Sequence, residues 1–279
     1  MDGDRIADLD QVEATMTYLV ANGETPFAYQ YVPPPGMPQR SGRYAEHAVT
    51  VRNARPLAGE LSLDRQGFIL TDHDSLVRDF YDEALVKTVH YPEVERLVRK
   101  HIGASRVVVF DHNVRSGSAT TRAATGVREP VHRVHNDYTA KSGPQRVRDL
   151  LPREAETLLL HRFAIVNVWR SIGWPVQDTP LGLCDARSMA PRDLVATELR
   201  YPDRTGETYS VAHNPAHRWY YFPRLRRDEA ILLKCFDSAT DGRARLSAHS
   251  AFADSGVPAG TPPRESIEVR TLAFFAPNA

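Results

Sequence analysis

The sequence has little of several features that would define a protein class at once. Its 279 residues include two cysteines, too few for a disulfide-stabilised fold and consistent with a reducing compartment. No run approaches the roughly 18 apolar residues that span a bilayer, which argues against a membrane protein. Residues 1–10 carry four aspartates and no apolar core of a secretory signal. We therefore expect a cytoplasmic protein.

The sequence also has no excess of charge of either sign. Lys+Arg and Asp+Glu both number 35, so the net charge is zero and gives no general attraction to nucleic acid or anionic membranes. The 42% hydrophobic and 25% charged residues are typical of a globular domain. We expect a single domain over residues 1–279 with a small-molecule ligand and neither a nucleic-acid nor a membrane partner. An extended N-terminal arm would permit a homodimer.

Residues 1–60 are expected to form that N-terminal arm. Apolar residues recur at helix-like spacing near its start, with Asp8 or Asp10 as the N-cap. A proline-rich run at 33–38 excludes helix and central strand, so we expect an extended segment there. The residues with helix-like spacing are Leu9, Val12, Met16, Leu19 and Val20.

Residues 61–130 are expected to form a helical flank and a loop. A helix is expected to begin near Ser75, and a second to follow Tyr91-Pro92 and end before Gly103. Short strands are expected at 67–70 and 106–110. Residues 111–130 have no apolar period and predict a long loop of the kind that often binds ligands.

Residues 131–279 read as the β-rich core of an α+β, mostly β fold. Short strand-like runs recur between turn signals, with one helical insert at 145–161. This pattern predicts a sandwich or barrel, of which the cupin-like jelly roll is one form, with the helices of the N-terminal part flanking it. The expected strands are 131–134, 163–168, 194–199, 208–211, 218–222, 229–236 and 266–275.

The strongest chemical signal is His135-Asn136-Asp137. On an extended strand, residues two apart point to the same side, so an imidazole and a carboxylate converge on a point that suits a divalent metal. A pair of this kind is common by chance, and an ordinary surface pair is the alternative. A third ligand would complete a two-histidine, one-carboxylate triad with open positions. We favour His249, which follows an apolar strand; the other candidates are His161, His213 and His217.

Arg264 and Ser266 predict an anion site in the last strand. They lie two apart and therefore face the same way, so a guanidinium and a hydroxyl can bind one carboxylate together. The alternative is a structural ion pair with Glu265 or Glu268.

Taken together, these segments resemble the non-haem iron(II), 2-oxoglutarate-dependent oxygenases. The similar branch includes the hydroxylating component of cephalosporin 7α-methoxylation and fungal secondary-metabolite hydroxylase/desaturase proteins, and the resemblance runs from about residue 45 onward. It rests on several strings in the same order. These strings are residues 135–139, 167–170, 175–181, 217–222, 228–229, 236–238, 249–252 and 264–270.

The resemblance implies a double-stranded β-helix core, iron(II), 2-oxoglutarate and dioxygen. It implies His135, Asp137 and His249 as the iron ligands, and Arg264 with Ser266 as the anchor of the 2-oxoglutarate carboxylate. Arg270 is the second choice of anchor. The chain would hydroxylate, desaturate or cyclise a small secondary metabolite while 2-oxoglutarate is decarboxylated to succinate.

Two other functions stay open from the sequence. One is a facial-triad iron enzyme of another reaction type, an epoxidase or isomerase. The other is a non-enzymatic β-barrel that binds a small molecule. Asn167, Trp219 and Tyr221 are candidates for substrate contact, although aromatic residues on strands more often belong to the core.

Overall fold

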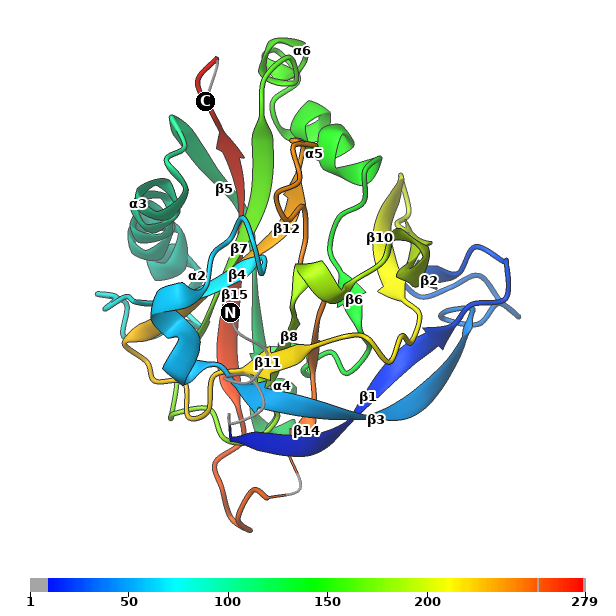
Figure 1. Cartoon of the computed structure of the whole chain (residues 1–279), viewed down its shortest axis with the longest axis vertical. Helices are drawn as coiled ribbons and strands as arrows, with labels where there is room; N and C mark the ends of the chain where they lie inside the picture. Colours follow the sequence, from blue (N-terminus) through cyan, green and yellow to red (C-terminus); the bar gives the residue numbers. More distant parts are fainter. Residues whose placement is uncertain (1–9, 255, 278–279) are drawn as a thin grey trace.

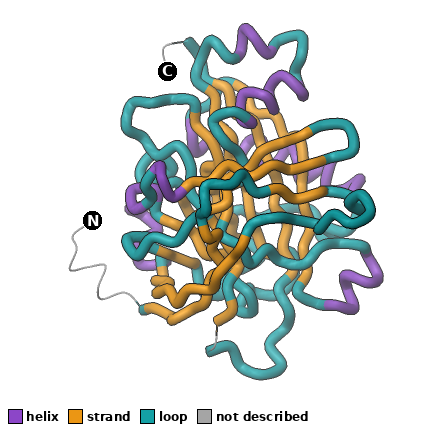
Figure 2. Tube along the Cα trace, turned by 90° about the vertical axis from the view of Figure 1, so that its right-hand side faces the viewer, coloured by secondary structure: helices purple, strands orange, loops and turns teal. Residues whose placement is uncertain are grey.

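The computed structural model describes residues 10–254 and 256–277, and within them the protein is mostly β with few helices (Figures 1 and 2). Two sheets form the body. The larger has the strand order β14-β1-β3-β11-β8-β13-β6-β10-β9-β2, and the smaller has the order β4-β12-β7-β15-β5. None of the helices in the described part of the chain has the length and apolarity needed to cross a bilayer.

The larger sheet is built mainly from short strands joined by irregular connections. Its members are β1 (Gln11–Val20), β2 (Phe27–Tyr29), β3 (Arg43–Asn53), β6 (His135–Asn136), β8 (Leu181–Cys184), β9 (Leu194–Arg200), β10 (Thr205–Val211), β11 (Trp219–Tyr221), β13 (His249–Ala251) and β14 (Ala253–Asp254).

The smaller sheet is antiparallel throughout. Its members are β4 (Phe68–Asp72), β5 (Arg106–Ser116), β7 (Phe163–Ser171), β12 (Glu229–Asp237) and β15 (Glu265–Phe274).

The helical segments are short. They are η1 (Arg55–Glu60), α2 (Glu83–Leu85), η2 (Val86–His90), α3 (Tyr91–Ile102), α4 (Ala119–Thr125), α5 (Ser142–Leu150), α6 (Ala155–Leu158), η3 (Ala186–Ser188) and η4 (Pro191–Asp193).

The central strand β7 is buried on both of its faces because each face packs against a different layer. Ile165 and Trp169 belong to a core shared with Leu183 of the larger sheet. The alternate residue Val166 packs in a second core with Val94 of α3. This two-sided burial explains why β7 reads as an almost continuous apolar run. It makes a rigid platform between the large sheet and the helical flank.

The expected helix near the N-terminus is wrong, because this segment is the strand β1. β1 pairs antiparallel with β3 along its whole length, from Gln11 opposite Arg52 to Val20 opposite Arg43. Its inward side chains recur with period two, and Ala14, Met16 and Tyr18 are all buried. The spacing that suggested a helix includes Leu19, which is out of phase with this alternation. Two residues of the expected helix, Asp8 and Leu9, lie outside the described residues. Within residues 10–60 the chain therefore does not form a mere surface arm, since β1 and β3 are strands of the large sheet.

Three further expectations between residues 61 and 134 need correction. The helix expected near Ser75 begins only at Glu83, where the Asp82 side chain accepts hydrogen bonds from the backbone amides of residues 84 and 85. The expected loop at 111–130 contains the second half of β5 and helix α4. The expected strand at 131–134 is irregular, with a single bridge at Arg133. By contrast, the helix after Tyr91-Pro92 is confirmed.

Candidate metal centre

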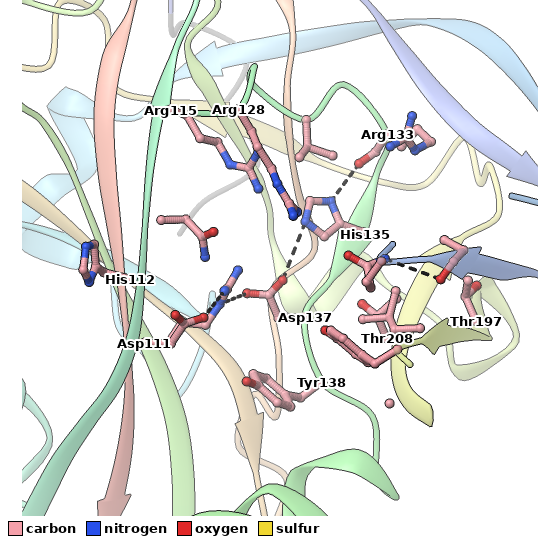
Figure 3. A pocket seen from close by; sticks show the side chains of 18 of the residues that line it. Asp111, His112, Arg115, Arg128, Arg133, His135, Asp137, Tyr138, Thr197 and Thr208 are labelled. Atoms are coloured by element: carbon pink, nitrogen blue, oxygen red, sulfur yellow. Dashed lines mark hydrogen bonds and ion pairs between the residues drawn. The ribbon is translucent and has the colours of Figure 1, made fainter. Parts of the chain in front are cut away.

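Two short strands of the large sheet bring three candidate ligands together. β6 and β13 are antiparallel neighbours in which His135 lies directly opposite His249. Asp137 follows β6 by one residue and turns toward the same point as His135. One ligand atom from each of the three side chains lies within 4.8 Å of the others. The distance from His135 Nε2 to Asp137 Oδ1 is 3.8 Å, and Figure 3 shows both side chains facing the pocket.

Backbone carbonyls fix the orientation of both imidazoles. His135 Nδ1 lies 2.8 Å from the carbonyl oxygen of Arg133, and His249 Nδ1 lies 3.3 Å from that of Ser247. Each Nδ1 therefore carries the proton and donates it, which leaves a lone pair on Nε2. His249 Nε2 is buried and has no hydrogen-bond partner among the described residues. A buried acceptor without a partner needs an explanation, and a metal ion held together with His135 and Asp137 would supply one.

The carboxylate of Asp137 accepts hydrogen bonds through one oxygen, which leaves its other oxygen available to a metal. Asp137 Oδ2 accepts a hydrogen bond from Asn167 Nδ2 at 2.7 Å and another from Arg270 Nε at 3.0 Å. Oδ1 accepts no hydrogen bond in the described structure and faces His135. Burial, the largest single cause, would raise the pKa of Asp137, but the charge of Arg270, the two nearby imidazoles and the hydrogen bond from Asn167 together outweigh it and hold this pKa well below its usual range.

The protonation states also suit a divalent cation. Burial, with a smaller contribution from His249, lowers the pKa of His135 to about 3, so this imidazole is neutral near pH 7. Two histidines and one carboxylate are the donor set of non-haem iron(II) oxygenases, in which the remaining coordination positions are open. The residues present therefore fit iron(II).

Arg264 lines the same cavity as the three candidate ligands, and it is a buried cation that forms no ion pair with a described residue. Its exposed fraction is 4%, and its guanidinium lies 5.0 Å from the ring of Trp169. It donates to Ser266 Oγ at 3.1 Å and to the carbonyl oxygen of Thr179 at 2.7 Å. No carboxylate of the described residues lies within ion-pair distance of it. Burial and the nearby charge of Arg115 lower the pKa of Arg264 to about 9, so it is still charged near pH 7.

Arg270 lines the same cavity but its charge is already neutralised. Besides Asp137, it contacts Asp111 at 2.9 Å and Glu268 at 2.8 Å. Three carboxylates surround this guanidinium, whereas Arg264 has none. The two arginines that the sequence leaves as alternative anchors thus differ sharply in their surroundings.

The other candidate histidines lie away from the triad. His217 Nε2 lies 3.1 Å from a carboxylate oxygen of Asp193, and the ring of His213 stacks on His47 with centroids 3.8 Å apart. His161 is exposed at the end of a turn after α6. Each therefore has a structural or solvent-facing environment.

Of the three candidate substrate residues, the structure brings one to the site. Asn167 contacts Asp137, as described above. Trp219 is fully buried and donates from Nε1 to the Tyr18 hydroxyl at 2.7 Å, while Tyr221 packs edge-on against Phe252. Both belong to the core under β1, and neither lines the cavity.

The sequence analysis did not identify two cavity residues on β5. Asn113 and Arg115 face the cavity and lie opposite Glu268 and Ser266 of β15, respectively. A strand that continued beyond residue 110 would have placed both on one face, because residues two apart share a side. The signal was therefore present in the alternation, but it needed the correct length of β5.

The site thus defines a class: a β-sheet protein in which two histidines and one carboxylate converge beside a buried arginine that has no acidic partner among the described residues. Similarity to known proteins agrees with it. The family model described as "Oxidoreductase/YMDC permease-like domain" matches residues 16–274. The hydroxylase/desaturase efuI of Hormonema carpetanum is 34% identical over 258 residues, which cover 84% of this chain and 85% of efuI.

Two further relatives are named as iron enzymes. The Fe(II)/2-oxoglutarate-dependent dioxygenase nvfI of Aspergillus novofumigatus is 33% identical over 254 residues, covering 88% of this chain and 90% of nvfI. A solved structure of the iron and α-ketoglutarate-dependent endoperoxidase NvfI superimposes with a TM-score of 0.86 at 30% identity, covering 96% of this chain and 99% of that one. The chain belongs to this family of Fe(II)/2-oxoglutarate-dependent oxygenases.

Proposed function

We propose that the protein is an iron(II)- and 2-oxoglutarate-dependent oxygenase that oxidises a small secondary metabolite. The observation that carries the proposal is the orphaned Nε2 of His249, which is buried beside His135 and Asp137 in a cavity that also holds the unpaired cation Arg264. A metal and an anion together satisfy both groups. The names of the relatives support the same cofactor and cosubstrate.

Each residue of the cavity has a distinct part in this proposal. His135, Asp137 and His249 bind iron(II), and the carboxylate supplies the only negative charge of the three. Arg264 and Ser266 bind the far carboxylate of 2-oxoglutarate through charge-assisted hydrogen bonds. Bound iron(II) would activate dioxygen, which is the oxidant, while 2-oxoglutarate would supply two electrons and be converted to succinate and carbon dioxide.

Arg270 is a positioning residue in this account. Together with Asn167 it occupies Oδ2 of Asp137, so that only Oδ1 is left for the metal. Partners of this kind orient a ligand and increase its affinity for metal without touching the metal themselves.

The coarse architecture supports a double-stranded β-helix core, because two facing sheets enclose the triad and one apolar core joins them. That shared core also supports one oxygenase domain spanning residues 1–279. A cytoplasmic location agrees with two buried, unpaired cysteines, Cys184 and Cys235. Whether the substrate is hydroxylated, desaturated or cyclised would depend on which of its bonds the cleft holds next to the metal.

The proposal is tested by measuring succinate released from 2-oxoglutarate. Purified protein with iron(II), 2-oxoglutarate and air should release succinate slowly even without substrate, and a chelator should abolish the release. His249→Ala should be inactive, while His217→Ala should keep the wild-type rate. Wild-type protein that binds iron yet releases no succinate would instead support a non-enzymatic binding protein.

A further inference from the structure

A pair of arginines stands at the mouth of the metal cavity. Arg115 lies near the end of β5, and Arg128 lies in the segment that runs alongside it, where the amide of Ser116 donates to the carbonyl oxygen of Arg128 at 3.1 Å. The two side chains therefore start from neighbouring backbone positions. Figure 3 shows both guanidinium groups directed toward His135.

Neither arginine has a carboxylate partner within residues 10–254 and 256–277. Arg115 donates from Nη1 to the backbone carbonyl of Glu129 at 2.8 Å. The exposed Arg128 side chain makes no hydrogen bond to any described residue. The nearby carboxylate of Glu268 is already engaged by Arg270. Glu129 lines the same cleft, and its carboxylate forms no ion pair with a described residue. The contrast with Arg270, which has three acidic partners, leaves two positive charges at the mouth without partners.

Arg115 links the inner cavity with a larger outer cleft. It lines the inner cavity with Arg264, and it lines the outer cleft with Arg128 and Tyr138. The outer cleft has a volume of about 1680 Å³, more than a molecule as small as 2-oxoglutarate requires. Burial lowers the pKa of Arg115, so its guanidinium has lost part of its hydration. A half-buried charge of this kind favours a bound anion.

We propose that the substrate is an organic anion whose carboxylate binds Arg115 and Arg128, with its carbon skeleton in the outer cleft. The proposal rests on the proposed function, because it assigns Arg264 to the cosubstrate and leaves the outer pair for the substrate. A carboxylate held at Arg115 lies next to the metal triad. The carbon atoms closest to that carboxylate are therefore the ones presented for oxidation.

The test compares carboxylic acids with their neutral amides. Benzoate, 2-naphthoate and cholate, each beside its own amide, are titrated by calorimetry into protein loaded with iron(II) and 2-oxoglutarate in the absence of oxygen. At least one acid should bind about tenfold more tightly than its amide, as expected for hydrogen bonds to a charged group. Arg115→Gln and Arg128→Gln should each reduce that preference, and the double variant should remove it. Arg153→Gln, which removes an exposed arginine outside the cleft, should keep it.

Three results would overturn the proposal. The first is that no acid binds better than its amide. The second is that the preference survives in the double variant. The third is that the double variant loses 2-oxoglutarate affinity as strongly as Arg264→Ala does. The last result would assign the pair to the cosubstrate. The same titrations on metal-free protein separate this proposal from the proposed function. If iron and 2-oxoglutarate do not bind, the proposed function fails, but a preference for acids that the double variant loses would still support this proposal.

Discussion

The guanidinium of Arg270 donates from Nε to Oδ2 of Asp137 at 3.0 Å. This contact ties the last strand of the small sheet to the carboxylate that follows β6 in the large sheet. It joins the two sheets at the centre of the candidate metal site. It also sets the negative charge and the orientation of Asp137, so the metal site depends on a residue that does not itself bind metal.

Removing Arg270 should therefore weaken iron binding without removing a ligand. We expect Arg270→Ala to lower iron(II) affinity by about 10- to 100-fold, the usual effect of losing a partner that orients a metal ligand. Arg270→Lys should lose less, because it keeps the charge. Anaerobic competition with a chelator measures the affinity, and Arg226→Ala, an exposed arginine paired with Asp228, is the matched control. Unchanged affinity in Arg270→Ala would show that Asp137 is oriented by other contacts.

The identity of the second histidine ligand is tested by a pair of alanine variants. His249→Ala should lose stoichiometric iron, because its unpartnered Nε2 faces the triad. His217→Ala should retain iron, since its ring is hydrogen-bonded to Asp193 away from the site. Asp137→Ala and His135→Ala should behave like His249→Ala while unfolding cooperatively. Iron retained in His249→Ala and lost in His217→Ala would reverse the assignment.

Arg264 should govern the affinity for 2-oxoglutarate. Truncating one partner of a buried charge pair costs about 2–5 kcal/mol, or roughly thirty- to several-thousand-fold in affinity. We expect a loss in this range for Arg264→Ala and a smaller one for Arg264→Lys, which keeps the charge but not the planar fork. Titration of 2-oxoglutarate into the iron-loaded variants without oxygen measures it, with Arg153→Ala as the control. Wild-type affinity in Arg264→Ala would remove this residue as the anchor.

The stability of the metal-free protein should fall with acid through His90. This ring is fully buried in the helical flank, and burial lowers its pKa to about 4 although the Glu93 carboxylate lies 3.0 Å away. Between pH 6.5 and 4 the unfolded chain therefore binds a proton that folded His90 does not. The free energy of unfolding should rise with pH across this window, by up to about 1.4 kcal/mol per pH unit for one group. His73, whose pKa burial also lowers to about 4, adds an effect of the same sign.

Urea unfolding at several pH values between 4 and 7 tests this dependence. His90→Gln should flatten the slope, whereas His161→Gln, which changes an exposed histidine, should not. A wild-type slope in His90→Gln would mean that other groups carry the acid sensitivity.

What the sequence could predict was mostly local. The pairing of His135 with Asp137 follows from two-residue alternation, and the structure brings both side chains to one point. His249 was favoured by its position after an apolar strand and by the resemblance to a known family, and β13 places it opposite His135. Strand β1 was mistaken for a helix because the apolar residue Leu19 breaks its inward alternation, and only pairing with β3 decides between the two structures.

The choice between Arg264 and Arg270 could not be made from the sequence. Both lie on or beside β15, and each has a glutamate within two residues, so local spacing does not distinguish them. The difference arises from segments distant in sequence: Asp111 and Asp137 reach Arg270, whereas Arg264 donates to a hydroxyl and a carbonyl oxygen. Arg115 was missed for a related reason, because its role depends on how far β5 extends.

The central claim is that one cavity binds iron(II) through the triad and 2-oxoglutarate through Arg264 at the same time. Visible absorption during anaerobic titration of 2-oxoglutarate into iron-loaded protein tests it most directly, because a keto acid chelated to iron(II) gives a charge-transfer band. We predict a band that saturates at one 2-oxoglutarate per iron and one iron per chain, that is absent in His249→Ala, and that needs far more 2-oxoglutarate in Arg264→Ala. A band that is absent in the wild-type protein, or unchanged in both variants, would contradict the account.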